Sequence, residues 1–169
     1  NVEKCILREA VVMQMTWPGA PTVYYGDEAG MVGWTDPDNR RSYPWGKQDW
    51  ELIEFHKDMI RIHKKYECFR SGSYKSIASG SHWICYGRFN KKLQAVILIN
   101  NRRDTLTVDL PIWQIGILEN ACLKRVIQTT QSTYNVGEVM ERAEDGILHV
   151  TVGPQTASVY IAAKNVEEN

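Results

Sequence analysis

The spacing of apolar residues changes near Phe69, and this change constrains the fold more than any other feature of the 169-residue chain. Before that point, apolar residues recur at steps of three and four along residues 2–17 and 49–66, which predicts two amphipathic helices. After it, short runs with strand character are separated by turn-forming residues. These runs cover residues 73–78, 82–89, 93–100, 105–110, 122–127, 136–140, 147–152 and 156–162. Such closely spaced strands predict an antiparallel sandwich or barrel that begins between Phe69 and Gly72.

The segment between the two expected helices has a different character. Pro18-Gly19 should end the first helix, and residues 21–25 are apolar on both faces, which predicts a parallel strand buried on both sides. The glycines and the Asp-Pro-Asp-Asn run that follow predict an irregular loop. We therefore expect an α/β unit over residues 1–70, an all-β domain over 71–164, and a polar tail over 165–169 that frays. In parallel α/β folds, ligands bind in the loops after the strands.

The charge balance excludes several classes of partner. The chain carries 20 basic and 20 acidic residues, so nothing in its net charge favours nucleic acid or an anionic membrane. No apolar run is long enough to span a bilayer. Four widely separated cysteines suggest free, mostly buried thiols and hence a reducing, cytoplasmic location. The chain begins without Met, inside an expected helix and without signal-peptide features, and we therefore expect it to be a piece of a longer protein.

No cofactor or metal is expected. His56 and His63 are seven positions apart on one expected helix, which separates them by about 10 Å and prevents them from sharing a metal ion. We interpret them as core or helix-end residues. The chain contains no glycine-rich phosphate loop and no nucleophile elbow.

Asp27 and Glu28 follow the expected strand and suggest a pair of catalytic carboxylates. Neighbouring residues that continue a strand project to opposite faces. Retaining glycoside hydrolysis, however, needs two carboxyl groups about 5–5.5 Å apart across one bond. We interpret the two acids as hydrogen-bond acceptors for loop amides, and not as a catalytic pair.

Asp36 and Arg40 are stronger candidates for ligand binding, because a loop that folds back can bring both to one ligand. A carboxylate beside a guanidinium suits a sugar with vicinal hydroxyls, but the same spacing also suits a salt bridge within the loop. Trp34, Tyr43 and Trp45 flank the pair. Their rings could stack on a sugar or could plug the rim of the fold, and spacing alone leaves both alternatives open.

The runs 19–31 (GAPTVYYGDEAGM), 36–41 (DPDNRR) and 43–46 (YPWG) resemble the region around the eighth barrel strand in the α-amylase family of glycoside hydrolases. The similarity is greatest to the branch of cyclomaltodextrinases, neopullulanases, maltogenic amylases and amylopullulanases. It is strong over the first 70 residues and looser beyond. Ser42-Tyr43 departs from the Pro-Met often found in neopullulanase-like members.

This resemblance implies that residues 2–17, 21–25 and 49–66 are the seventh helix, eighth strand and eighth helix of a (β/α)8 barrel, followed by a Greek-key β-sandwich. It also implies a retaining hydrolase acting on α-glucans such as starch, pullulan, cyclodextrin or maltooligosaccharides. The residues that match Asp36 and Arg40 bind glucose hydroxyls in this family. Its catalytic acids come from the fourth, fifth and seventh strands, so we expect no catalytic residue here and no activity from this chain alone.

A barrel slice without its neighbours would leave backbone groups and apolar faces bare. We therefore predict a rearranged or self-associating α/β half in isolation. An alternative function is a carbohydrate-binding or structural interaction module formed by the β-sandwich. His82, Trp83, Tyr86 and Trp113 are then the possible stacking groups, although Trp83 shares a strand face with Cys85, which favours burial in the core.

Overall fold

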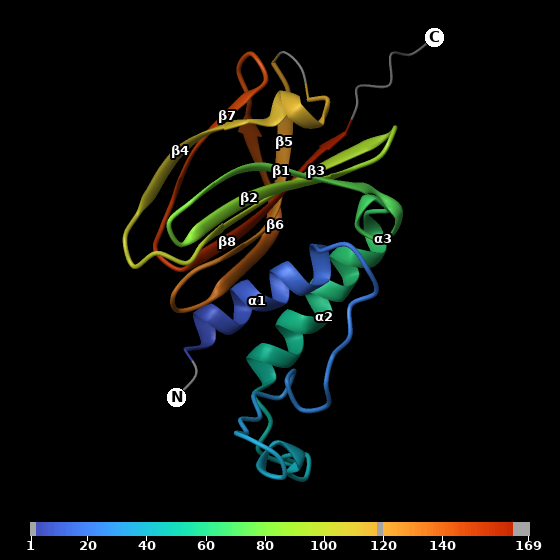
Figure 1. The fold of residues 1–169 in the computed structure, drawn as a ribbon, viewed down its shortest axis with the longest axis vertical. Coiled ribbons are helices and arrows are strands. Elements are labelled where there is room, and N and C mark those ends of the chain that lie inside the picture. The colour runs from blue at the N-terminus through green and yellow to red at the C-terminus, as the bar shows by residue number, and fades with distance from the viewer. Residues whose placement is uncertain (1–2, 118–119, 164–169) are drawn as a thin grey trace.

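The computed structural model describes residues 3–117 and 120–163 of the chain. Helices dominate the first part and strands the rest (Figure 1). The helical elements are α1 (Lys4–Thr16), η1 (Asp38–Arg40), α2 (Trp50–Lys65), α3 (Cys68–Ser71) and η2 (Ile112–Ile115). The strands are β1 (Ser73–Gly80), β2 (Trp83–Phe89), β3 (Leu93–Asn100), β4 (Leu106–Pro111), β5 (Cys122–Thr129), β6 (Tyr134–Arg142), β7 (Ile147–Val152) and β8 (Thr156–Ala163). The predicted tail at 165–169 lies outside the described residues.

The strands form two antiparallel sheets that pack as a sandwich. The larger sheet has the order β1-β2-β3-β8-β5-β6, and the smaller sheet pairs β4 with β7. Strand β8 therefore lies between β3 and β5, in the interior of the sheet. The expected antiparallel β architecture is confirmed, and each of the eight strands predicted after Gly72 forms with its boundaries displaced by two residues at most.

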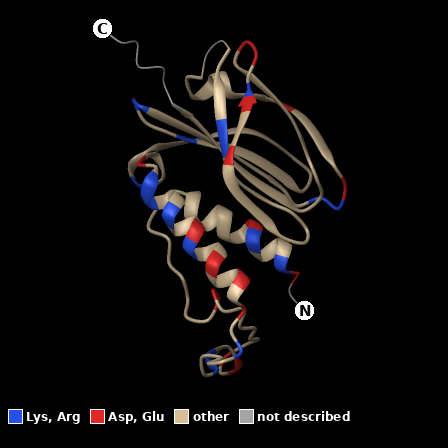
Figure 2. Ribbon diagram, turned by 180° about the vertical axis from the view of Figure 1, so that it is seen from behind, with Lys and Arg blue, Asp and Glu red and all other residues tan. Residues whose placement is uncertain are grey.

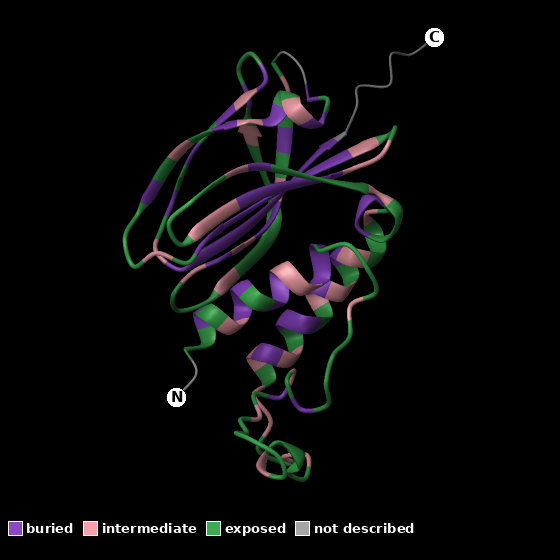
Figure 3. Ribbon diagram, in the orientation of Figure 1, coloured by how far each residue is buried: buried purple, intermediate pink, exposed green. Residues whose placement is uncertain are grey.

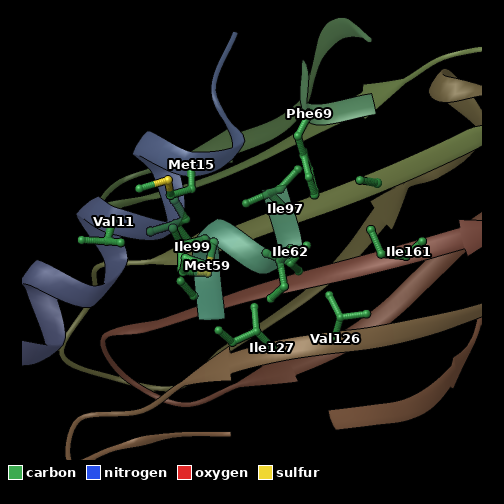
Figure 4. Close-up of a cluster of buried hydrophobic side chains, with 14 of the residues drawn as sticks. Val11, Met15, Met59, Ile62, Phe69, Ile97, Ile99, Val126, Ile127 and Ile161 are labelled. Carbon is green, nitrogen blue, oxygen red and sulfur yellow. The ribbon is translucent and has the colours of Figure 1, made fainter. Parts of the chain in front are cut away.

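The larger sheet is covered on both faces, which explains why β3 is apolar along nearly its whole length. Ala95, Ile97 and Ile99 point toward the helices, whereas Val96 and Leu98 point toward the smaller sheet. This two-residue alternation divides the interior into two cores. Figure 4 shows the helix-side core, where side chains of α1 and α2 meet those of the larger sheet.

The helices share this core with the sheet instead of forming a separate one. Phe55 and Met59 of α2 and Val12 of α1 are fully buried against it. At the end of α1, the Thr16 hydroxyl lies 2.6 Å from the Tyr86 hydroxyl in β2. The structure thus shows the helices folded onto the sandwich. Self-association stays a prediction.

The strand predicted over residues 21–25 does not form, and this part of the fold prediction was wrong. Residues 17–49 instead make a long loop between α1 and α2 with the short η1 turn inside it. Val23, Tyr24 and Tyr25 are 37%, 51% and 44% exposed. A parallel strand needs neighbours for its backbone groups, and the described residues offer none beside this segment.

The second helix begins as predicted. The Asp49 carboxylate accepts a hydrogen bond from the Leu52 amide at 3.3 Å, which is the N-cap arrangement that the sequence suggested. Figure 2 shows charged residues of both signs along α1 and α2. Within 3–117 and 120–163, no helix is both long and apolar enough to cross a bilayer.

Candidate functional site

The loop over residues 17–49 extends beyond the first turn of α2, away from the sandwich (Figure 1), and most of it is exposed (Figure 3). Its return to α2 is fixed by the Asp49 amide, which donates to the Ala29 carbonyl at 3.0 Å. Lys4 of α1 forms an ion pair with the Asp49 carboxylate, and this contact joins the loop's end to both helices. These two contacts fix the end of the loop against α1 and α2.

Asp36 and Arg40 lie together at the tip of this loop. The Arg40 Nε is 2.7 Å from Asp36 Oδ1, across the η1 turn. Their side chains are 60% and 69% exposed, so solvent screens the attraction and the pair adds little to folding stability. Asp36 and Arg40 thus form the salt bridge within the loop that their spacing suggested. The remaining polar atoms of both side chains are open to a ligand.

A second charged pair beside the first was missed by the sequence reasoning. The Asp38 carboxylate accepts from the Trp34 amide at 3.0 Å and from Arg41 Nε at 2.9 Å. The hydrogen bond from Arg41 holds the pKa of Asp38 below its usual range. The run DPDNRR signalled this pair, because each acid has an arginine three or four positions later. Asp38 therefore organises the turn, while Asp36 and Arg40 form its outer edge.

Three aromatic residues flank these pairs in the sequence, of which Trp34 and Trp45 are open to solvent and Tyr43 is half-buried. Trp34 is 84% exposed and Trp45 is 80% exposed. The rings of Tyr43 and Trp45 lie 4.6 Å apart, centroid to centroid, and are tilted by 51°. None of the three is a buried plug within this chain. Aromatic faces beside hydrogen-bonding groups fit a ligand with an apolar face and polar edges, such as a sugar ring.

A cavity of 430 Å³ lies between the loop and the first turns of the two helices. It is lined by Lys4, Leu7, Tyr24, Tyr25, Asp27, Gly30, Met31, Val32, Gly33, Asn39, Asp49 and Leu52. Burial raises the pKa of Asp27, and the neighbouring Glu28 charge adds to the shift. Glu28 itself accepts a hydrogen bond from the Gly26 amide at 2.9 Å, as predicted, whereas Asp27 lines the cavity. The strand geometry that we assumed for these two acids is absent, since they lie in a turn.

Gly33 explains how the loop closes on itself. A Cβ atom at this position would lie 2.6 Å from the Asn39 Cα, closer than nonbonded carbon atoms approach. The glycine therefore permits the chain before Trp34 to pass directly against the η1 turn. Close approach of two backbone segments is a usual role of glycine.

The histidines and cysteines behave as structural residues. His56 Nδ1 lies 2.8 Å from the Leu52 carbonyl, and His63 Nδ1 lies 2.7 Å from the Met15 carbonyl. No cluster of potential metal ligands occurs in the described part of the chain. All four cysteines are free, and of these Cys122 alone is exposed, as the prediction of mostly buried thiols requires.

The aromatic candidates on the sandwich differ in how far they are exposed. Tyr86 is fully buried, so its proposed role in stacking was wrong; its hydroxyl serves the contact with Thr16. Trp83 is partly buried against the core between the two sheets, together with Cys85. Trp113 is 54% exposed.

Comparison with known proteins agrees with the sequence resemblance. The chain is 39% identical over 165 residues to an amylopullulanase of Thermoanaerobacter thermohydrosulfuricus, a match that covers 92% of this chain and 11% of that protein. It is 35% identical over 113 residues to neopullulanase 2 of Thermoactinomyces vulgaris, covering 64% of this chain and 19% of that protein. No protein-family model matches the chain.

A solved structure gives the same relationship. The structure resembles the α-amylase of Geobacillus thermoleovorans, solved with acarbose, with a TM-score of 0.80 and 25% identity over 96% of this chain and 34% of that one. The chain thus spans between a tenth and a fifth of the two curated relatives and about a third of the solved enzyme. The described strands match the β-sandwich domain of such enzymes. By sequence and by fold, this chain is a relative of the α-amylase family of glycoside hydrolases.

Proposed function

We propose that the chain is the carboxyl-terminal part of a retaining α-glucan hydrolase, in which it contributes substrate-binding residues while the catalytic acids lie elsewhere. The observation that carries this proposal is the exposed loop, where the Asp36–Arg40 pair stands beside open aromatic rings. The 39% sequence identity to an amylopullulanase, over 92% of this chain, supports an α-glucan as the ligand.

The loop binds glucose units through two kinds of contact. The second carboxylate oxygen of Asp36 accepts from one sugar hydroxyl, and the free guanidinium nitrogens of Arg40 donate to its neighbour. Trp45, 80% exposed, offers an apolar face to the ring. The Asp38–Arg41 pair holds the turn that brings Asp36 and Arg40 together.

The same proposal accounts for the unusual exposure of the loop's apolar residues. We propose that residues 1–70 are the last helix–strand–helix portion of a (β/α)8 barrel. Val23 and Tyr24, 37% and 51% exposed here, then belong to a strand that pairs with neighbours in the whole enzyme. In their absence the segment stays irregular and offers a surface through which two copies of the chain can associate.

Two assays test the proposal. The purified chain should release no reducing sugar from pullulan, cyclodextrin or maltotriose, because a retaining hydrolase needs two carboxyl groups placed across the scissile bond. Turnover at the rate of an ordinary glycosidase would show that the catalytic acids are present after all.

Sugar binding is measured by calorimetry with maltohexaose. Asp36→Ala and Arg40→Ala should each weaken binding about tenfold, the loss expected for one hydrogen bond to a charged group. Glu54→Ala is the matched control, because it removes an exposed ion pair with Lys57 of 2.7 Å on α2, outside the loop. Equal affinity of the loop variants and this control would remove the loop from the binding site.

A further inference from the structure

A second hollow lies on the opposite side of α1, between that helix and the turn that joins β1 to β2. It has a volume of 400 Å³, within the range of small-molecule sites. Its walls are mainly apolar and include Ile6, Met13, Trp83 and Ile84. None of these residues belongs to the loop that carries Asp36 and Arg40.

One buried carboxylate lines this hollow with an unsatisfied oxygen. Glu9 of α1 is 3% exposed. Its Oε2 accepts from the Asn101 side-chain amide at 2.6 Å, but its Oε1 has no hydrogen-bond partner within the described residues. A buried acceptor without a donor costs about 1–3 kcal/mol, so a ligand in the hollow that brings a hydrogen-bond donor to Oε1 removes this cost.

The rim of the hollow supplies further polar groups in fixed positions. The Asn101 amide donates to the His82 carbonyl at 2.8 Å, and this contact locks the turn before β2 to the turn after β3. His82 and Asn101 also line an adjoining polar hollow of 520 Å³ that includes Arg102 and Arg103. An apolar hollow with a carboxylate therefore continues directly into a polar one.

This arrangement favours one class of ligand. A purely apolar molecule would leave the Glu9 oxygen unpaired. An organic cation would pair with Glu9 but would meet a net positive charge where the hollows join, because Asp104, which is ion-paired with Arg102, offsets only one of the two arginines. A neutral polyhydroxyl chain satisfies both parts, because its hydroxyls donate to Glu9 and reach the polar hollow while its C–H faces cover Ile84 and the partly buried Trp83.

We propose that the two hollows form a second oligosaccharide-binding site, with Glu9 as its central hydrogen-bond acceptor. The site lies on the junction between α1 and the sandwich. It rests on the contacts of Glu9 and does not depend on the role proposed for the 17–49 loop.

The test is a titration of the 15N-labelled chain with maltotriose, followed by amide chemical shifts. Resonances of Trp83 and Asn101 should move in the wild type. Glu9→Leu should weaken this binding at least tenfold and keep the fold, because it replaces a half-satisfied buried carboxylate by an apolar side chain of similar size. Asn101→Ala should weaken it as well, since Glu9 then loses its anchor. Arg40→Ala should leave these shifts unchanged.

Three results would overturn the inference. The first is an absence of shifts at Trp83 and Asn101 at any maltotriose concentration, and the second is wild-type affinity in Glu9→Leu. The third is movement of the same resonances with protein concentration in the absence of sugar, which would identify a second copy of the chain as the occupant. Binding that is lost in Arg40→Ala but kept in Glu9→Leu would refute this site and leave the proposed function standing.

Discussion

Glu9 should make the stability of this protein depend on pH in an unusual direction. Burial raises the pKa of this carboxyl from 4.5 to about 7, and the hydrogen bond from Asn101 offsets only part of the shift. A raised carboxyl pKa means that the folded chain holds the proton more tightly than the unfolded chain. The contribution of Glu9 to stability is therefore fully present below pH 4.5 and declines as the pH rises toward 7.

The magnitude follows from the size of the shift. At about 1.4 kcal/mol per pKa unit, the free energy of unfolding should fall by about 3 kcal/mol between pH 4.5 and pH 8 through this one group. The substitution Glu9→Gln keeps the size of the side chain and removes the titration. A constant offset between the variant and the wild type cancels in this comparison, so the difference between their free energies of unfolding should change by about 3 kcal/mol across this window.

The assay is urea unfolding at half-unit steps from pH 4.5 to pH 8, with the free energy taken by linear extrapolation. Asp27 titrates in the same sense, since burial also raises its pKa, and the comparison with Glu9→Gln cancels its contribution because both proteins contain it. Parallel curves for the two proteins would refute the reasoning. They would mean that the Glu9 carboxyl is hydrated in the folded chain.

Three further predictions concern the rest of the structure. Arg88 is a buried cation that donates to the carbonyls of Thr16 and Gly72 at 2.7 and 3.0 Å. Arg88→Met should therefore lower the free energy of unfolding by about 3 kcal/mol, measured by denaturant titration. Lys57→Met, an exposed change, is the control and should leave this free energy unchanged. Asp49→Ala removes the N-cap of α2 and should lower the free energy of unfolding by about 1 kcal/mol. Asp49→Asn, which keeps a side-chain acceptor, should lose much less of this free energy. Cys122 should react with a thiol reagent in the native protein while the three buried cysteines react only on unfolding; a second fast thiol would contradict the burial pattern.

The proposed binding loop illustrates how far a local pattern can be followed. The DPDNRR run places each acid within reach of an arginine, and the structure realises the Asp36–Arg40 and Asp38–Arg41 pairs. The sequence could not decide whether the first pair would be buried. Exposure depends on what covers the loop, and among the described residues nothing does.

The strands of the sandwich and both long helices could be predicted from the chain alone, because these elements depend on periodicities of two and of three to four residues that any reader of the sequence can see. The sequence also determined the N-cap at Asp49, a contact between residues three positions apart. The strand expected at 21–25 failed for a complementary reason. Its residues have strand character, but a strand exists only when other strands bind its backbone groups.

The burial of Glu9 and its hydrogen bond from Asn101 follow only from the folded structure. In the sequence Glu9 is one more polar residue within an amphipathic helix, and no neighbour in the chain distinguishes it from an exposed glutamate. Its burial and its partner Asn101, 92 positions away, arise only when α1 packs against the end of β3. Contacts between distant segments set solvation and electrostatics, and for that reason the most chemically distinctive carboxylate of this protein is invisible until the chain is folded.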